Sequence, residues 1–211
     1  MNVLPPRRRL LATLVAGAAI VGACGGSASP SPAPAQPAGG IDGCPSGPPD
    51  ALGAGETRTV TITTDLGAIG IRVEADLSPI AVGNFVALAD CGYYDGVVFH
   101  RVVPRFVIQG GDPTGTGRGG PGYTISDEAV TVAYRRGVVA MARTSQPDSQ
   151  GSQFFIVLDD AGAQSLAAAN TYAIMGEVVT GMDVADAIAA AADAELPSDP
   201  VVMTDVSVSA P

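Results

Sequence analysis

Apolar and polar residues alternate in the region that follows residue 56, which is the pattern of half-buried β-strands. Val60 and Ile62 alternate with polar neighbours, an Asp-Leu-Gly turn occupies residues 65–67, and the alternation resumes over residues 69–73. This pattern predicts a β-hairpin. We expect the folded domain to begin with it.

Two later segments have helical spacing. Ser78 and Pro79 are typical of an N-cap and a first turn, apolar residues then recur every three or four positions, and Cys91 precedes a glycine that ends the helix. A second helix is expected over residues 182–192. Short apolar runs separated by Gly or Pro predict six more strands, over residues 97–103, 106–109, 138–142, 154–158, 172–179 and 201–208. Eight strands and two helices favour a mainly β fold, an eight-stranded antiparallel barrel closed by a helix at each end.

The first 23 residues have the features of an export signal. Three arginines at positions 7–9 precede an apolar stretch that is too short to span a membrane in the usual way. Residues 21–24 resemble a bacterial lipobox, in which Cys24 would be lipidated and would become the new N-terminus. Ordinary secretory cleavage remains an alternative, and the arginines leave open export by the general or the twin-arginine route. We expect a cell-membrane anchor at Cys24, with the domain on the extracytoplasmic side.

Residues 24–55 are dominated by Gly, Ser, Ala and Pro and show no apolar periodicity. Such composition predicts a disordered tether, so the three expected regions are 1–23, 24–55 and 56–211. Cys44 in the tether and Cys91 in the domain form an even pair. An oxidising compartment would allow a disulfide between them, and the sequence alone leaves that pairing open.

Charge and composition narrow the classes of partner and chemistry. The chain carries a net charge of −10, which repels nucleic-acid phosphates and anionic lipid heads, so membrane contact is expected only through the N-terminal lipid. No lysine is present, which excludes a P-loop lysine and Schiff-base chemistry. One histidine and three cysteines are too few and too scattered for a zinc motif, so no metal is expected. No long heptad or broad apolar stripe demands a partner, and a monomer is expected.

Three further features have ordinary interpretations. Residues 115–120 satisfy G-x-G-x-x-G, but no helix follows to hold a pyrophosphate, so we interpret them as a flexible glycine loop and expect no cofactor. His100 is the single histidine, within an apolar strand, and is interpreted as a packed, hydrogen-bonded structural residue. Asp159 and Asp160 are interpreted as a solvated turn.

The most informative segment is residues 99–112, which places Arg101 and Gln109 among apolar side chains. Burying an unpaired guanidinium is costly, so Arg101 needs a partner or a function. This segment, together with residues 115–120, 139–144 and 151–156, resembles the cyclophilins. The resemblance extends in order over about residues 56–211, including 175–178 and 181–184. It implies a peptidyl-prolyl cis-trans isomerase that acts on proline-containing polypeptides.

The resemblance also implies residue roles. Arg101, Phe106 and Gln109 would be catalytic. The residues implied to bind substrate are Val107, Gly117, Met141, Ala142, Arg143, Thr144, Gln153, Phe155, Leu166 and Tyr172. Val107, Arg143 and Tyr172 stand where methionine, asparagine and histidine are common in the family, and Leu166 is aligned across a longer spacing. In the family a tryptophan is important for tight cyclosporin binding. This chain has no tryptophan, so only weak cyclosporin binding is expected.

The implied chemistry suits an arginine. Rotation about an X-Pro bond is opposed by a barrier of ~18–20 kcal/mol, because the nitrogen lone pair is delocalised. A fixed, permanently charged donor beside that nitrogen stabilises the twisted state selectively. We expect the chain to assist the folding of exported or envelope proteins. The alternatives are a non-catalytic chaperone or scaffold that binds proline-containing segments, and a lipoprotein whose barrel is only a spacer.

Overall fold

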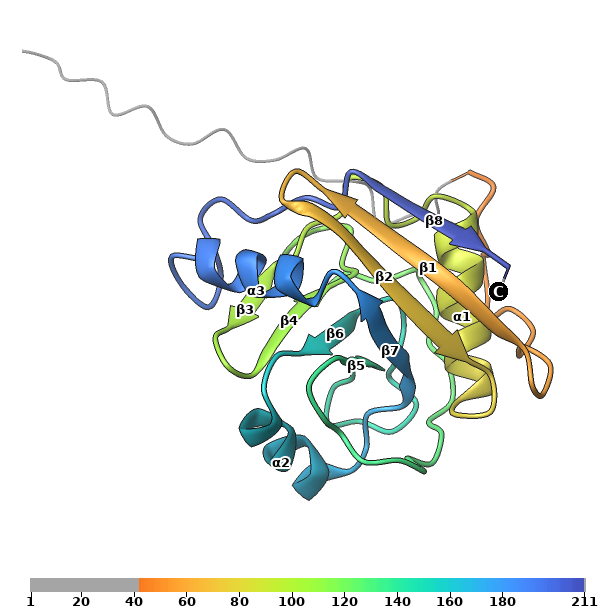
Figure 1. Cartoon of the computed structure of the whole chain (residues 1–211). Coiled ribbons are helices and arrows are strands. Elements are labelled where there is room, and N and C mark those ends of the chain that lie inside the picture. The colour runs from red at the N-terminus through yellow and green to blue at the C-terminus, as the bar shows by residue number, and fades with distance from the viewer. Residues whose placement is uncertain (1–41, 211) are drawn as a thin grey trace, which may run out of the picture. The chain divides into compact units, whose positions relative to one another are not determined.

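The computed structural model describes residues 42–210. The predicted signal peptide, the lipidation site Cys24 and the first part of the tether therefore lie outside the described residues. A curled eight-stranded sheet and three helices make up the domain (Figure 1). The elements in chain order are β1 (Thr57–Thr64), β2 (Gly67–Glu74), α1 (Pro79–Asp90), β3 (Arg101–Val103), β4 (Val107–Gly110), β5 (Val138–Met141), β6 (Phe154–Val157), α2 (Asp160–Ala169), β7 (Ile174–Thr180), α3 (Met182–Ala191) and β8 (Asp205–Ser209).

The sheet is antiparallel throughout, in the order β3-β4-β6-β5-β7-β2-β1-β8. Strands β1 and β2 form the predicted hairpin. The two edge strands are β3 and β8, and the segments that precede them meet: Val98 bridges Val202, and the Phe99 amide donates to the Val201 carbonyl at 3.0 Å. The sheet thus curls back on itself, and the predicted mainly β, eight-stranded fold is confirmed.

Alternation along the central strands creates two apolar layers. On β6, Phe154 and Ile156 face the large inner core, whereas Phe155 and Val157 face a smaller outer layer that also contains Leu166 of α2. Both faces of β6 are buried, which explains its unbroken apolar sequence. Several residues of this outer layer also line a groove at the surface.

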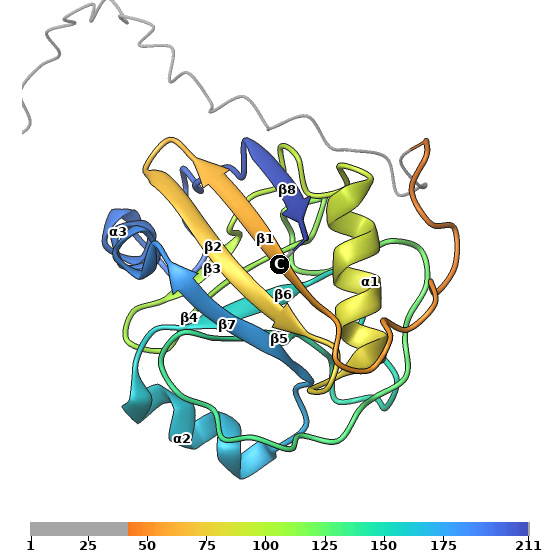
Figure 2. The ribbon, with the colours of Figure 1, turned by 45° about the vertical axis from the view of Figure 1, so that its right-hand side comes forward.

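Helices α1 and α3 are the two predicted helices. Helix α1 packs beside β1 and β8, α3 lies against β2 and β4, and the three helices occupy separate places around the sheet (Figure 2). Ser78 stands at the predicted N-cap, but its hydroxyl donates to the Leu77 carbonyl instead. The carboxylate of Glu128 accepts from the Ile80 and Ala81 amides at 2.9 and 2.8 Å. A carboxylate that is distant in sequence therefore caps the N-terminus of α1, where its negative charge also complements the helix dipole.

Helix α2 was not predicted, and the expectation of a solvated turn at Asp159 and Asp160 was wrong. Asp159 is the N-cap, and its carboxylate accepts from the Ala161 amide at 2.8 Å. Only Ala163 and Leu166 of the helix are buried. Two buried positions make too weak an apolar stripe to be distinguished from a loop by pattern.

The described part of the predicted tether also differs from the expectation of disorder. Cys44 and Cys91 form a disulfide with a Cα–Cα distance of 5.2 Å. The Leu52 amide donates to the Pro79 carbonyl at 3.0 Å. A Cβ atom at Gly83 of α1 would collide with the Asp50 carbonyl oxygen, so the segment passes very close to the helix. Residues 44–55 therefore belong to the folded domain rather than to a free tether.

Two features are absent from residues 42–210. No described helix combines the length and apolar character that crossing a membrane requires. No three His, Cys, Asp or Glu side chains in this range are grouped so that they could hold a metal ion.

Candidate active site

Strand register brings the central residues of the site together. Arg101 on β3 pairs with Gln109 on β4, and Gln109 pairs with Phe155 on β6. Directly paired residues project from the same face of a sheet, so these side chains form a row. The row borders a groove of about 210 Å³ lined by Arg101, Phe106, Val107, Gln109, Ala142, Arg143, Phe155, Leu166 and Tyr172. All three predicted catalytic residues line this groove, with six of the predicted substrate-binding residues.

The guanidinium of Arg101 is held by a chain of polar side chains. Its Nε donates to Glu195 Oε1 at 2.7 Å, and its Nη1 donates to Gln109 Oε1 at 3.4 Å. Gln109 Nε2 donates to Gln153 Oε1 at 3.0 Å, and Gln153 in turn donates to the Gly119 carbonyl at 2.9 Å. No acceptor within the described residues engages Nη2 of Arg101. The guanidinium is therefore oriented and still has a donor to offer a ligand.

Glu195 is a residue of the site that sequence reasoning missed. It lies in the loop after α3, and its carbonyl also accepts from the Val102 amide of β3 at 2.8 Å. Its separation of 94 positions from Arg101 gives no local motif. An acidic residue in an acidic loop looks like ordinary solvated surface, so no sequence signal distinguishes it.

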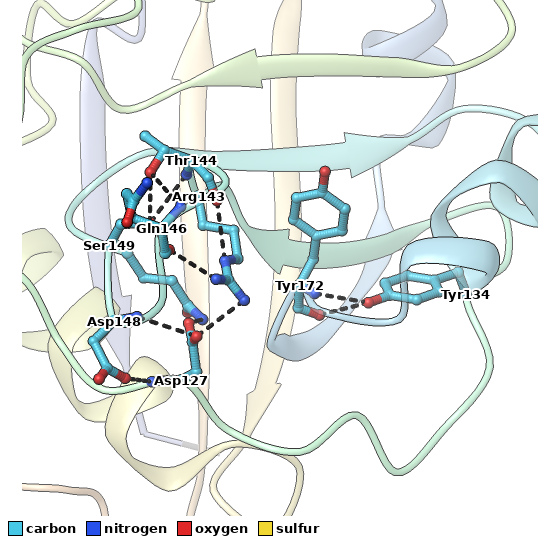
Figure 3. Close-up of polar contacts among 9 residues, drawn as sticks. Asp127, Tyr134, Arg143, Thr144, Gln146, Asp148, Ser149 and Tyr172 are labelled. Carbon is cyan, nitrogen blue, oxygen red and sulfur yellow. Dashed lines mark hydrogen bonds and ion pairs between the residues drawn. The ribbon is translucent and has the colours of Figure 1, made fainter.

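The apolar wall of the groove is built from the outer layer. The rings of Phe155 and Tyr172 meet edge to face, with centroids 5.4 Å apart. The hydroxyl of Tyr134 donates to the Tyr172 carbonyl at 2.8 Å and accepts from the Tyr172 amide at 3.1 Å (Figure 3). Burial raises the pKa of Tyr134, so its hydroxyl remains protonated and able to donate. Tyr134, which the sequence did not single out, thus fixes the backbone of a groove residue.

Helix α2 supplies the other wall, through Leu166. The helix can approach because residue 162 is glycine: a Cβ atom there would lie 2.7 Å from the Arg105 carbonyl oxygen and 2.9 Å from Phe106 Cδ2. Phe106, which belongs to the β3–β4 turn, is thereby packed against α2. One missed helix therefore positions two of the predicted site residues.

Arg143 lines the groove, but its charged head is already engaged. Nη1 lies 2.9 Å from Asp127 Oδ2, Nη2 donates to the Gln146 carbonyl at 2.7 Å, and Nε donates to the Thr144 carbonyl at 3.2 Å (Figure 3). The side chain is only 10% exposed. Arg143 therefore fastens its own loop and is not a free donor toward the groove.

A larger hollow of about 410 Å³, here called the side hollow, adjoins the groove and shares Gln109, Ala142 and Arg143 with it. Its other lining residues are Gly117, Arg118, Gly119, Gly120, Pro121, Tyr123, Thr124, Thr144, Ser149, Gly151, Ser152 and Gln153. The predicted substrate residues Gly117, Thr144 and Gln153 are therefore in the side hollow rather than in the groove.

Met141 does not belong to either hollow, although it was predicted to bind substrate. It is fully buried in the inner core. On β5 the side chains alternate, so Ala140 faces the outer layer and Met141 faces inward, while Ala142 reaches the groove. Its neighbours in the motif line the groove, but Met141 itself has a packing role.

The glycine loop is organised around Asp112, which is fully buried. Its carboxylate accepts from the Thr114 amide at 2.7 Å and from the Arg118 amide at 2.9 Å. Burial alone would raise the pKa of Asp112, but hydrogen bonds from Gly119 and Thr114 outweigh it and hold the pKa below its usual value. No helix begins in this loop, so it lacks the geometry of a dinucleotide fingerprint.

His100 is buried, as predicted, with 4% of its surface exposed. Neither ring nitrogen forms a hydrogen bond within the described residues, so the expected hydrogen bonding is not found. Burial lowers the pKa of His100, because the charged form is poorly solvated there. His100 is not among the residues that line the groove, and its position is that of a packed core residue.

The groove combines an oriented cation with an apolar slot. None of its lining residues is His, Cys, Asp or Glu. The lining therefore lacks the Ser–His, Cys–His or carboxylate pairs on which most covalent catalysis depends. It suits an uncharged ring that enters the slot and an amide that receives a hydrogen bond from Arg101.

Comparisons with protein families and with individual relatives all identify peptidyl-prolyl cis-trans isomerases. Residues 59–208 match the family described as "Cyclophilin type peptidyl-prolyl cis-trans isomerase/CLD". Peptidyl-prolyl cis-trans isomerase ppi1 of Schizosaccharomyces pombe is 44% identical over 130 residues, which cover 59% of this chain and 81% of that protein. Peptidyl-prolyl cis-trans isomerase-like 2 of Cryptococcus neoformans is 51% identical over 102 residues, covering 45% of this chain. The match spans only 18% of that larger relative.

A solved structure is also similar. The cyclophilin-type peptidyl-prolyl cis-trans isomerase of Cryptosporidium parvum, determined in the presence of the dipeptide Ala-Pro, superimposes with a TM-score of 0.64 at 32% sequence identity. The match covers 72% of this chain and 99% of that one. The matched region therefore includes nearly all of the Cryptosporidium protein's chain.

Proposed function

This chain belongs to the family of cyclophilin-type peptidyl-prolyl cis-trans isomerases, and we propose that it accelerates rotation about X-Pro peptide bonds in other proteins. The observation that carries the proposal is the orientation of Arg101 at the border of an apolar groove, with Nη2 unengaged among the described residues. The Ala-Pro dipeptide present with the Cryptosporidium relative supports the substrate class.

The role of Arg101 follows from the transition state of rotation. In the planar amide the nitrogen lone pair is shared with the carbonyl, whereas in the twisted state it is localised on the nitrogen. A donor held beside the nitrogen therefore binds the twisted state more tightly than either planar state. A guanidinium remains charged at every relevant pH, so the reaction requires no proton transfer.

The apolar wall holds the proline ring while the preceding residue turns. Phe155 and Leu166 are almost fully buried, which places the ring in a poorly solvated slot. A lower local dielectric strengthens the contact from Arg101. An acceleration of ~10⁵-fold requires about 7 kcal/mol of selective stabilisation, which a charged donor and desolvation together can supply in order of magnitude.

The activity is tested by NMR exchange spectroscopy of an Ala-Pro peptide with and without the protein. Catalysis predicts an enzyme-dependent rise in the cis-trans exchange rate at substoichiometric protein. Peptide binding with an unchanged exchange rate would instead identify a chaperone or scaffold that binds proline-containing segments.

We further propose that the protein is exported, is anchored to the cell membrane by a lipid on Cys24, and assists the folding of exported or envelope proteins. Support comes from the signal-like residues 1–23, the lipobox-like sequence at 21–24, and the Cys44–Cys91 disulfide, which is typical of oxidising compartments. Cys24→Ala should release the protein from the membrane fraction. Retention of this variant on membranes would refute the anchor.

A further inference from the structure

Most arginines of this acidic domain are paired with carboxylates. Residues 42–210 contain eight arginines and 21 acidic residues, and seven of those arginines lie within ion-pair distance of a carboxylate. The exception among the described residues is Arg118. On a surface with so many carboxylates, an unpaired guanidinium is a distinctive feature.

Arg118 lies on the glycine loop, at the side hollow. Its backbone amide donates to the buried Asp112 carboxylate at 2.9 Å, which fixes the position of its Cα. The residue is exposed and lines the side hollow. The other arginine of that hollow, Arg143, already has its head engaged by Asp127 and two carbonyls (Figure 3). Arg118 is therefore the cation that the hollow can offer to a ligand.

No carboxylate lines the side hollow. The hollow is also continuous with the groove, because Gln109, Ala142 and Arg143 line both. A polypeptide whose proline occupies the groove would therefore pass a neighbouring side chain into the hollow. That side chain would meet the Arg118 guanidinium and neutral polar groups.

We propose that Arg118 makes the side hollow selective for an acidic side chain, Asp or Glu, close in sequence to the substrate proline. The proposal rests on the isomerase function proposed above and specifies its substrate class. A guanidinium recognises a carboxylate through paired hydrogen bonds. The acidic surface elsewhere repels the same peptide, so the hollow is the place where its carboxylate is accepted.

The test uses Ala-rich peptides with one proline, in which Glu or Gln is placed at each of the three positions before and after it. Exchange kinetics give kcat/KM for each Glu and Gln pair. At one position near the proline, Glu should exceed Gln by about two- to fivefold, the range expected for an exposed ion pair. Added salt should reduce the difference, because exposed charges are screened.

Arg118→Gln should bring the ratio at that position close to one. The matched control is Arg135→Gln, which makes the same charge change at an exposed arginine that lines neither the groove nor the side hollow. The control should retain the preference for Glu. The proposal is wrong if no position favours Glu, or if Arg118→Gln keeps the preference. If no peptide is isomerised, the proposed function fails, and the Kd values of the same Glu and Gln peptides, from NMR titration, test Arg118 on its own.

Discussion

At the scale of single residues, Arg101 depends on contacts that come from distant parts of the chain. Gln109 lies on the neighbouring strand, but Glu195 lies 94 positions away, in the loop after α3. The motif around residues 99–112 predicted the arginine and its glutamine. It could not predict the carboxylate, because that contact exists only after the sheet has curled and α3 has packed.

Glu195 is expected to position Arg101. Glu195→Ala should lower kcat by about two- to fivefold, in line with an exposed ion pair, with little change in KM, because the guanidinium loses an orienting contact and no binding surface is removed. Glu195→Gln keeps an acceptor and should recover part of the loss. Steady-state exchange kinetics measure both constants. Asp186→Asn, which breaks the Arg136 ion pair outside the groove, serves as the control. A change in KM alone would contradict this role.

His100 predicts a pH dependence of stability. Burial lowers its pKa from the usual 6.5 in the folded state, although the nearby Asp112 opposes this effect and Arg101 adds to it. The stability that neutral His100 contributes is fully present above pH 6.5 and falls as the pH decreases through that value toward the folded-state pKa. Asp112, with its lowered pKa, affects stability only as the pH falls below about 3.8. The two effects therefore begin at different pH values as the pH falls, near 6.5 for His100 and near 3.8 for Asp112.

The Tm of the wild type should accordingly decline between about pH 7 and pH 5, and His100→Gln should flatten that decline. Thermal unfolding followed by circular dichroism across this range measures the slope. Parallel curves for the two proteins would show that His100 does not titrate on unfolding.

At the scale of elements, the strands were predictable and one helix was not. Alternation in β1 and β2 and unbroken apolar runs in β5 and β6 are strong signals. Helix α2 has only two buried residues and begins at a pair of aspartates, so its sequence fits a turn equally well. The groove residues on the strands followed from the motif. The placement of Leu166 by a helix could not be foreseen.

Gly162→Ala tests how α2 supports the groove. Alanine normally favours a helix over glycine by roughly 0.5–1 kcal/mol. Here the added methyl group would contact Arg105 and Phe106 at 2.7 and 2.9 Å, so α2 must move. We expect a loss of about 1–3 kcal/mol in unfolding free energy and a raised KM. Urea unfolding and exchange kinetics measure these quantities. Ser165→Ala, on the exposed side of α2, should change neither. Increased stability of Gly162→Ala would show that the close approach is unimportant.

At the scale of the whole molecule, long-range connections hold the curled sheet together. The segments before β3 and β8 meet across the closure, and the Cys44–Cys91 disulfide ties the region before β1 to the end of α1. Composition predicted a tether up to residue 55, because Gly, Ser and Pro give no apolar pattern. The pair Cys44 and Cys91, which remains once Cys24 is assigned to the lipid anchor, was the one signal that part of this segment is fixed on the domain.

Removing this disulfide should destabilise the domain without impairing catalysis. The bridge joins residues 47 positions apart, for which loop entropy gives about 4 kcal/mol, and measured effects are typically about 2–4 kcal/mol. The double variant Cys44→Ser/Cys91→Ser should lose stability in that range in urea unfolding. Its exchange kinetics at 25 °C should match the wild type, because neither cysteine lines the groove. Equal unfolding curves would contradict a stabilising role.

The central claim, that Arg101 stabilises the twisted amide, is tested most directly by measuring binding and exchange of one Ala-Pro peptide on Arg101→Ala and Arg101→Lys. Both should bind the peptide within a few-fold of the wild-type Kd, because the apolar slot remains. Both should lose exchange at saturation, by about 10²-fold or more for alanine and less for lysine, which keeps the charge but not the fork of donors. Exchange at the wild-type rate in Arg101→Ala, with the fold intact, would contradict the account.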